Sequence, residues 1–143
     1  MSICILRWGG RRLESGEIDT LLEEARIARV CCHNEDGTIH ATPTWFRYEN
    51  GYVRVPIMSD SRKARNIKRN KNVTILIDLV RPPRGVMIYG SAELDDVDVI
   101  AKAISVNEKY QSKENAKATI ERFLKETDFI LTVKIERLVS FHY

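Results

Sequence analysis

The sequence predicts a mainly β protein with added α-helices, arranged as a six-stranded antiparallel barrel with helices on its outside. Six segments carry alternating apolar or β-branched residues, and short turn-forming sequences join most of them, which is typical of hairpin-connected strands. One short polar helix is expected between the third and fourth strands, and two amphipathic helices before the last strand.

The first half of the chain predicts a helix followed by a meander of three strands. Glu17–Ala25 carries apolar residues at helical spacing, with acidic residues in the first turn that suit a helix N-terminus. The strands are expected over Ile27–His33, Thr38–Tyr48 and Tyr52–Ile57. Asn34–Gly37 and Asn50-Gly51 supply the turns between them. Pro56 has no N–H to donate, so we expect it at a sheet edge or a bulge.

The second half predicts three helices and three strands. Ser59-Asp60-Ser61 offers N-cap oxygens ahead of a short helix over Arg62–Arg69, which is too polar to be core. The strands are expected over Val73–Leu79, over Val86–Leu94 with an interruption at Gly90, and over Phe129–Tyr143. Asp95-Asp96 is expected to cap a helix that carries Val97, Ile100, Ala101 and Ile104. The last helix is expected over Lys113–Glu126, with Ala116, Ile120, Phe123 and Leu124 on its apolar side.

Length and composition limit the class of protein. A chain of 143 residues is long enough for one domain with a hydrophobic core, so we expect a single domain over residues 1–143, with 1–14 as a flexible leader. Hydrophobic residues at 43% and charged residues at 30% exclude a disordered chain. No apolar run reaches the roughly 18 residues of a membrane span. Met1–Trp8 lacks the basic start and cleavage site of a signal peptide, so we expect a cytoplasmic protein.

Metal, redox and hydrolytic chemistry have little support. The three cysteines include no CxxC pair, and Cys31 and Cys32 are interpreted as small buried hydrophobic residues rather than a redox pair. His33, His40 and His142 show no metal-ligand spacing, so we expect no metal site. No serine lies in a nucleophile-elbow sequence.

Positive charge is concentrated in one segment. Between Ser61 and Asn72 the chain carries six basic residues and no acidic one, namely Arg62, Lys63, Arg65, Lys68, Arg69 and Lys71. The rest of the chain then holds 17 basic and 20 acidic residues, so the net charge of +3 is a local property. Such a patch indicates an anionic partner at one place, whereas a nucleic-acid coat would spread the charge more widely.

Ser61–Asn66 is the most informative stretch, because it follows a strand and begins a helix. A helix N-terminus exposes unpaired backbone N–H groups and a partial positive charge, to which Arg62 adds a guanidinium fork and Lys63 a point charge. This combination predicts a site for a phosphomonoester. The alternative interpretation is a solvated basic helix face, which composition alone makes equally acceptable.

Trp45 lies on the second predicted strand. Alternation directs Pro43 and Trp45 to one side of the strand and Thr44 and Phe46 to the other. Trp45 could form a wall for a flat conjugated ligand, or it could simply pack in the core or at an interface. Tyr89 and Tyr110 could donate a proton near such a ligand, although buried tyrosines usually serve structure first.

Four stretches of the sequence occur in a distinctive order: Val53–Ile57, Ser61–Ile67, Asn72–Asp78 and Gly85–Leu94. This succession of strand, S-[RK]-K, helix, apolar strand and G-x-A-E-L resembles the flavin-binding split-barrel family related to pyridoxamine 5′-phosphate oxidase. The resemblance covers the chain from about Leu21 to Leu94. It implies a six-stranded antiparallel split β-barrel with Greek-key elements and flanking helices. It also implies a homodimer that holds FMN, or in some branches the deazaflavin F420, at the dimer interface.

The resemblance also assigns site residues. Arg62 and Lys63 would bind the FMN phosphate, with Ser61 adding a hydroxyl or backbone donor. The flavin ring and ribityl chain would run along two further sets, Thr42, Pro43, Thr44 and Trp45 on the second strand and Ile57, Met58 and Ser59 at the end of the third. No catalytic residue is assigned.

Three departures separate this chain from the oxidase itself. Ile57 stands where the oxidase has a Thr, and Gly85 stands where it has a flavin-contacting Gln. The oxidase's C-terminal substrate elements, a Trp and an Arg-His pair, have no counterpart in Val133–Tyr143. We therefore expect flavin binding without pyridoxamine phosphate oxidation.

The leading hypothesis is an FMN-dependent oxidoreductase that takes a hydride from a small-molecule donor and passes electrons to an acceptor. The alternatives are an F420-dependent reductase and a flavin carrier or sensor without turnover. A nucleic-acid binder using Arg62–Lys71 comes last, because aromatic residues do not alternate with the basic ones. We expect a homodimer with neither a nucleic-acid nor a membrane partner.

Overall fold

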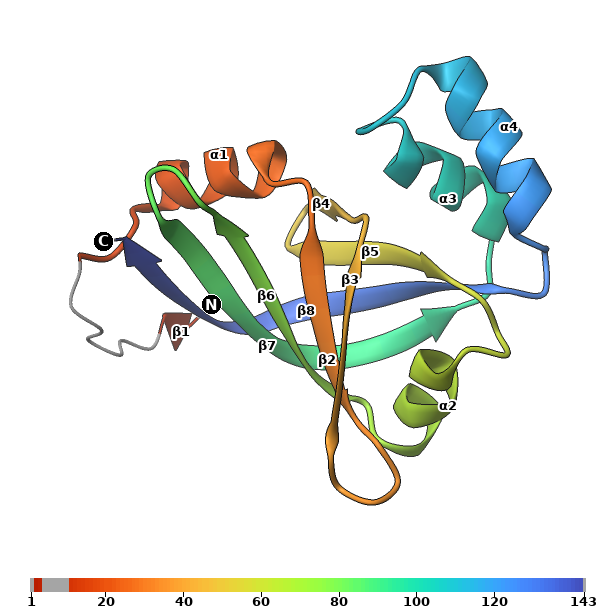
Figure 1. Cartoon of the computed structure of the whole chain (residues 1–143), viewed down its shortest axis with the longest axis horizontal. Coiled ribbons are helices and arrows are strands. Elements are labelled where there is room, and N and C mark those ends of the chain that lie inside the picture. The colour runs from red at the N-terminus through yellow and green to blue at the C-terminus, as the bar shows by residue number, and fades with distance from the viewer. Residues whose placement is uncertain (1, 4–10, 143) are drawn as a thin grey trace.

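Alternating apolar residues fold the chain into a curled β-sheet that forms a half-barrel, with helices packed around it (Figure 1). The structure is a computed structural model that describes residues 2–3 and 11–142. Within these residues the strands are β1 (Ser2–Ile3), β2 (Ala28–His33), β3 (Ile39–Thr44), β4 (Arg47–Glu49), β5 (Tyr52–Ile57), β6 (Asn72–Leu79), β7 (Arg84–Asp95) and β8 (Phe129–His142). The helices are α1 (Ser15–Glu24), α2 (Arg62–Arg69), α3 (Val99–Asn107) and α4 (Lys113–Phe123).

The sheet order is β3-β2-β6-β7-β8-β5-β4, with β1 paired to β8 in parallel and all other pairs antiparallel. The last strand, β8, thus lies inside the sheet between β7 and β5. The register between β7 and β8 shifts at Tyr89/Gly90. A side chain at position 90 would collide with the backbone oxygen of Lys134, so only glycine fits at this bulge.

The prediction of a mainly β, antiparallel half-open barrel with flanking helices is confirmed, but its count of six strands is too low. One extra strand, β1, precedes the first predicted element, and a second arises because the predicted strand Thr38–Tyr48 is broken into β3 and β4. The break lies at Phe46, whose backbone N–H and C=O both bond the Tyr110 hydroxyl at 3.0 Å instead of a neighbouring strand. A partner 64 residues away therefore bends the strand.

Three helices differ in extent from the sequence prediction: α1 covers Ser15–Glu24 instead of Glu17–Ala25, α4 ends at Phe123 instead of Glu126, and α3 begins later than expected. Asp95 ends β7 and accepts a bond from the N–H of Val97, so α3 begins only at Val99. Val97 is then exposed rather than part of the helix's apolar side. In α4, the Phe123 side chain is exposed although Ala116 and Ile120 are buried as expected.

The predicted turn residues adopt the backbone conformations that their chemistry allows. Asn50 and Gly51 both have positive φ, 51° and 81°, as a two-residue turn between β4 and β5 requires. Gly37 in the β2–β3 turn has φ of 86°. Pro56 lies on β5 beyond the residues that pair with β4, so the prediction of an edge position is confirmed.

The main core fills the concave side of the sheet. Side chains from β2, β5, β6, β7 and β8 pack there against Leu21 and Leu22 of α1 and against Ala64 and Ile67 of α2. A smaller cluster joins α3 and α4 to the start of β8 through Val99, Ala103, Ile120 and Ile130. None of the described helices is both long and apolar enough to span a bilayer.

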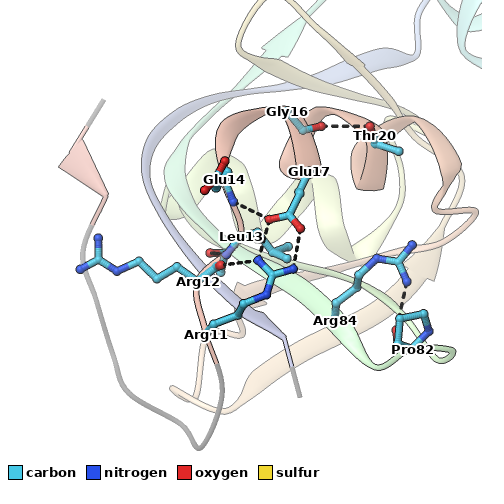
Figure 2. A network of polar contacts seen from close by, with 10 residues as sticks. Arg11, Arg12, Leu13, Glu14, Gly16, Glu17, Thr20, Pro82 and Arg84 are labelled. Atoms are coloured by element: carbon cyan, nitrogen blue, oxygen red, sulfur yellow. Dashed lines mark hydrogen bonds and ion pairs between the residues drawn. The ribbon is translucent and has the colours of Figure 1, made fainter.

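A polar network holds the start of α1 (Figure 2). The guanidinium of Arg11 donates to both carboxylate oxygens of Glu17, at 2.8 and 2.6 Å, and Glu17 also accepts the N–H of Glu14 at 2.8 Å. Leu13 is buried, and its N–H donates to the Ser140 hydroxyl at 3.0 Å. The predicted leader over 1–14 and the apolar stretch Met1–Trp8 lie largely outside the described residues.

Candidate functional site

A polar N-cap fixes where helix α2 begins, and two buried apolar residues fix which side of it packs on the sheet. Ser61 is the N-cap residue, and its hydroxyl accepts the N–H of Ala64 at 3.1 Å. Ala64 and Ile67 are buried against the sheet, which fixes the side of the helix that faces the core. The helix covers Arg62–Arg69, as the sequence predicts. The first backbone N–H groups of any helix have no helical acceptor, so this end favours an anion.

The basic residues of this segment fall into two groups. Arg65 donates to the Asp60 carbonyl at 2.6 Å, Lys68 lies 5.2 Å from the Phe129 ring centre, and Arg69 donates to the carbonyl of His33 at 3.1 Å. Arg62 and Lys63 form neither a hydrogen bond nor an ion pair with any residue that the structure describes. Lys71, beyond the end of α2, also lacks a side-chain partner among the described residues, so within α2 itself the unpaired cations are the two at its N-terminus.

Lys63 is half-buried despite its charge. Burial lowers the pKa of its ammonium below the ordinary value, and the nearby Cys32 thiol offsets this in part. An ammonium removed from water without an acceptor is unfavourable. An anion bound against Lys63 would relieve that cost.

The strand that faces this helix end is the sheet edge β3. His40, Thr42 and Thr44 are half-buried, whereas Ile39, Ala41 and Pro43 between them are exposed. Thr42 pairs in register with Val30 of the core, so this half-buried side of β3 is continuous with the barrel interior. The Thr42 hydroxyl oxygen is fully buried and has no hydrogen-bond partner among the described residues. Buried polar groups in proteins are almost always hydrogen-bonded, so this hydroxyl lacks the partner that it would normally have.

His40 belongs to the same neighbourhood. Burial lowers the pKa of its imidazole, and the charges of Lys63 and Arg62 lower it further. The sequence prediction gave His40 no role, since it lacked metal-ligand spacing; its register on β3 brings it toward α2.

A buried amide locks α2 against the β2–β3 hairpin, and Figure 1 shows this helix beside the hairpin's lower half. Asn66 is 4% exposed and donates to Asn34 Oδ1 at 2.9 Å and to Cys32 Sγ at 3.6 Å. A groove of about 350 Å³ runs between the helix and the turn, lined by Asn34, Glu35, Asp36, Arg62, Arg65, Asn66 and Arg69. The pKa of the Asp36 carboxyl is lowered chiefly by hydrogen bonds from Thr38, and the charge of Arg62 contributes least to this shift.

Trp45 lies at the far end of β3. Its indole stacks on the Tyr110 ring, with centres 4.4 Å apart and planes 7° from parallel, and the Arg26 guanidinium lies 4.7 Å from the same tyrosine ring centre. Trp45 remains 37% exposed, whereas Phe46 is fully buried. Trp45 therefore packs within the chain and also offers surface to a ligand, and Tyr110 serves structure first.

The segment before α2 places the remaining predicted site residues. Ile57 is 6% exposed and belongs to the core, so it offers a ligand mainly its backbone, whereas Met58 is 52% exposed. Ser59 donates its N–H to Asp128 Oδ1 at 2.8 Å. Asp128 thereby fixes the approach to α2 from the start of β8, a role that no local sequence signal indicated.

The interpretation of the two adjacent cysteines as buried residues holds for Cys32 but not for Cys31. Cys32 is buried and points toward α2, and Cys31 is half-buried on the opposite side of β2. Burial raises the pKa of the Cys31 thiol, with a smaller contribution from Cys32. Both are free thiols.

Two residues that the structure brings to the candidate site were given no role there by the sequence analysis, namely His40 and Asn66. The site brings Arg62 and Lys63 together with the half-buried side of β3, where Thr42 and Thr44 lie. Pro43 instead lies on the exposed side of that strand. Alternation along the second predicted strand could have indicated His40, which shares a side with Thr42 and Thr44.

Comparisons with known proteins agree with this architecture. The family model described as pyridoxamine 5′-phosphate oxidase matches residues 15–135. A conserved hypothetical protein of Mycobacterium tuberculosis has a similar structure, with a TM-score of 0.78 at 21% identity, covering 96% of this chain and 89% of that one. No curated protein matches the chain.

Two further solved structures are similar. A protein named F420 reductase gives a TM-score of 0.70 at 21% identity, covering 88% of this chain and 98% of its own. A FAD-binding protein of Mesorhizobium loti gives 0.70 at 17% identity, with coverages of 95% and 99%. At these identities the likeness concerns the fold.

Proposed function

The chain belongs to the pyridoxamine 5′-phosphate oxidase family, and on that premise we propose that it binds FMN and acts as an oxidoreductase. The observation that supports this best is the pair Arg62 and Lys63, two cations without a partner among the described residues at the N-terminus of α2. A phosphomonoester supplies the dianion that this helix end lacks.

The residues present fit such a cofactor at three points. The phosphate would be held by Arg62, Lys63 and the first N–H groups of α2. The ribityl chain would follow the half-buried side of β3, where the Thr42 hydroxyl lacks a partner among the described residues. The ring would pass round the open edge of β3 to reach Trp45, whose exposed surface suits a flat conjugated system.

The chemistry of hydride transfer comes from the flavin when it is bound. The chain's own residues bind and orient it: Lys63 and Arg62 hold the anionic end, and Asn66 keeps α2 in place against β2. Tyr110 keeps Trp45 stacked and holds the Phe46 backbone. No step is expected to need an acid or base from this set.

F420 is the alternative cofactor, since one structural neighbour is named F420 reductase. The exposed surface of Trp45 suits either ring system, and the cations of α2 could hold the anionic tail of F420. Pyridoxamine phosphate oxidation is not part of the proposal, because the oxidase's C-terminal substrate elements, a Trp and an Arg-His pair, have no counterpart in Val133–Tyr143. Gly85, which stands where the oxidase has a flavin-contacting Gln, has no room for a side chain beside Phe141.

We also propose that the chain functions as a homodimer with its flavin between subunits. Strand β3 is a sheet edge with exposed Ile39 and Pro43, and Trp45 continues this surface. A second copy would cover these residues and the open edge together. Nucleic acid is a weaker candidate, because Arg65, Lys68 and Arg69 already contact groups of this chain.

The absorbance spectrum of the purified protein, followed by titration with FMN and with F420, tests the proposal. Bands near about 370 and 450 nm indicate bound FMN and a single band near about 420 nm the deazaflavin, as for the free cofactors. Light scattering during dilution tests the shared site, since a monomer with full flavin occupancy contradicts it. Reduction of the bound flavin without turnover of any acceptor would favour a carrier or sensor. Binding of neither cofactor would refute the proposed function.

A further inference from the structure

We propose that His40 is a third cationic ligand of the cofactor phosphate, so that loading of the cofactor takes up a proton near neutral pH. This inference rests on the proposed function, because it concerns the same phosphate site. Arg62 keeps its charge near neutral pH, whereas His40 changes charge within the physiological range. His40 would therefore let the pH change the affinity of this site for the cofactor phosphate.

The geometry places His40 beside the two cations. His40 pairs in register with Cys32 across β2 and β3, so both side chains lie on the same side of the sheet. The Cys32 sulfur accepts a bond from Asn66 of α2 at 3.6 Å. Lys63 and Arg62 precede Asn66 by three and four residues, which puts them about one helical turn nearer the N-terminus on that face. His40 is half-buried and has no hydrogen bond with any described residue.

The charged groups around His40 determine the direction of the effect. Lys63 and Arg62 face it from α2, the Cys32 thiol lies beside it on β2, and Asp36 in the adjoining turn is engaged by Thr38. In the free protein, burial and the two cations keep the pKa of His40 below its ordinary value, so the neutral form predominates at pH 7. A phosphate dianion would outweigh those cations and raise the pKa.

The sign of the linkage follows from this difference. Because His40 has a higher pKa in the complex than in the free protein, affinity increases as the pH falls through the pKa of the complex. The increase stops below the pKa of the free protein. It is limited to about tenfold per pH unit, since one proton is involved. The useful window lies above about pH 6, where the phosphate itself stays a dianion.

The experiment measures the dissociation constant of FMN between pH 8.5 and 6.5 for the full chain. We expect the wild-type affinity to increase at least about threefold over this range, within the one-proton limit. His40→Gln should bind more weakly at pH 6.5 and lose this increase. His40→Arg should bind tightly at every pH in the range, because its charge does not titrate.

Two controls separate His40 from other titrating groups. His33→Gln removes an exposed imidazole from the other side of the hairpin and should leave the pH dependence unchanged. Riboflavin, which lacks the phosphate, should bind the wild type with an affinity that does not follow the His40 titration. NMR titration of the His40 ring should show its pKa rising when FMN is added.

The outcomes distinguish this inference from the proposed function. If FMN binds but wild type and His40→Gln share one pH dependence, the inference is wrong and the function stands. If neither FMN nor F420 binds, the probe becomes inorganic phosphate, and an increase in the His40 pKa would support the anion site without the flavin. No change of the His40 pKa with either probe would overturn the inference.

Discussion

Helices α1 and α2 begin in opposite ways, although both leave backbone N–H groups without helical acceptors. At α1 the chain supplies its own anion: Glu17 lies in the first turn, accepts the N–H of Glu14 and is bound by Arg11 (Figure 2). At α2 the first turn contains no acid, and Arg62 and Lys63 stand there instead. Helix α4 resembles α1, with a Ser112 cap and Glu114 in its first turn.

The difference separates a structural helix end from a binding one. A carboxylate near a helix N-terminus stabilises it, and a cation there is unfavourable by a similar amount, about 0.3–1 kcal/mol at an exposed site. The end of α1 is satisfied within the chain. At the end of α2 the Ser61 hydroxyl caps one N–H group, but no acid lies in the first turn, which is the basis of the proposed phosphate site.

The largest expected effect comes from removing the cations of α2. Arg62→Ala combined with Lys63→Ala should weaken FMN binding at least about 100-fold, because each charge-assisted contact contributes about 1.5–3 kcal/mol. The circular dichroism spectrum should not change, since neither side chain belongs to the core. Lys68→Ala with Lys71→Ala removes the same charge from the same segment and should retain binding. If both double variants lose the same FMN affinity, the segment acts only as a general basic surface and not as a specific phosphate site.

An added anion should stabilise α2 and leave α1 unaffected. Inorganic phosphate at about 100 times its dissociation constant should stabilise the wild type by about 2.7 kcal/mol, measured by thermal unfolding. The Arg62→Ala, Lys63→Ala double variant should gain nothing specific from phosphate and should equal or exceed the wild type in phosphate-free buffer. Equal stabilisation of the two proteins would place the anion elsewhere.

Tyr110→Phe tests the ring end of the proposed site. The change leaves the Phe46 backbone without the hydroxyl that it bonds at 3.0 Å. We expect a loss of about 1–3 kcal/mol in the free energy of unfolding by urea. Tyr52→Phe removes a hydroxyl with no bond to any described residue and should change stability little. A loss that is equally small for Tyr110→Phe would mean that the break between β3 and β4 has another cause.

The smallest expected effect comes from Glu17 at the start of α1. Hydrogen bonds from the Arg11 side chain, and next the one from the Glu14 backbone N–H, lower the pKa of Glu17 to about 2. A carboxyl with a lowered pKa stabilises the fold above its unfolded pKa, about 4.3, and loses this contribution as the pH falls toward 2. Wild type should therefore exceed Glu17→Gln in stability at pH 7, with the difference shrinking between pH 5 and pH 2. A difference that stays constant with pH would exclude a charge-based role.

Local patterns were sufficient for most of the fold. Periodicity and capping predicted α2 with its observed ends, and Asn50-Gly51 and Pro56 indicated a turn and an edge that the structure contains. The failures involve distant partners. Nothing near Phe46 in the sequence indicates that Tyr110 takes its backbone groups, and nothing near Val97 shows that β7 continues to Asp95.

In the candidate site, too, local patterns predicted neighbouring residues but not partners that are distant in the sequence. Helix-start chemistry pointed to Ser61, Arg62 and Lys63, because these residues are neighbours in sequence. His40 and Asn66 join them only through the pairing of β2 with β3 and the packing of α2 on β2, which no local pattern contains. The distinction between paired and unpaired cations in Arg62–Lys71 likewise required the structure.

The most direct test compares both helix ends in one spectrum. In a ¹H–¹⁵N correlation spectrum of the full chain titrated with FMN, the backbone amides of Arg62, Lys63 and Ala64 should shift with the occupancy of the ligand, because they are the donors nearest the phosphate. The amides of Gly16 and Glu17 at the start of α1 should stay in place. Saturable FMN binding that leaves the α2 amides unmoved, or that shifts those of α1 instead, would contradict the assignment of α2 as the end that takes its anion from outside.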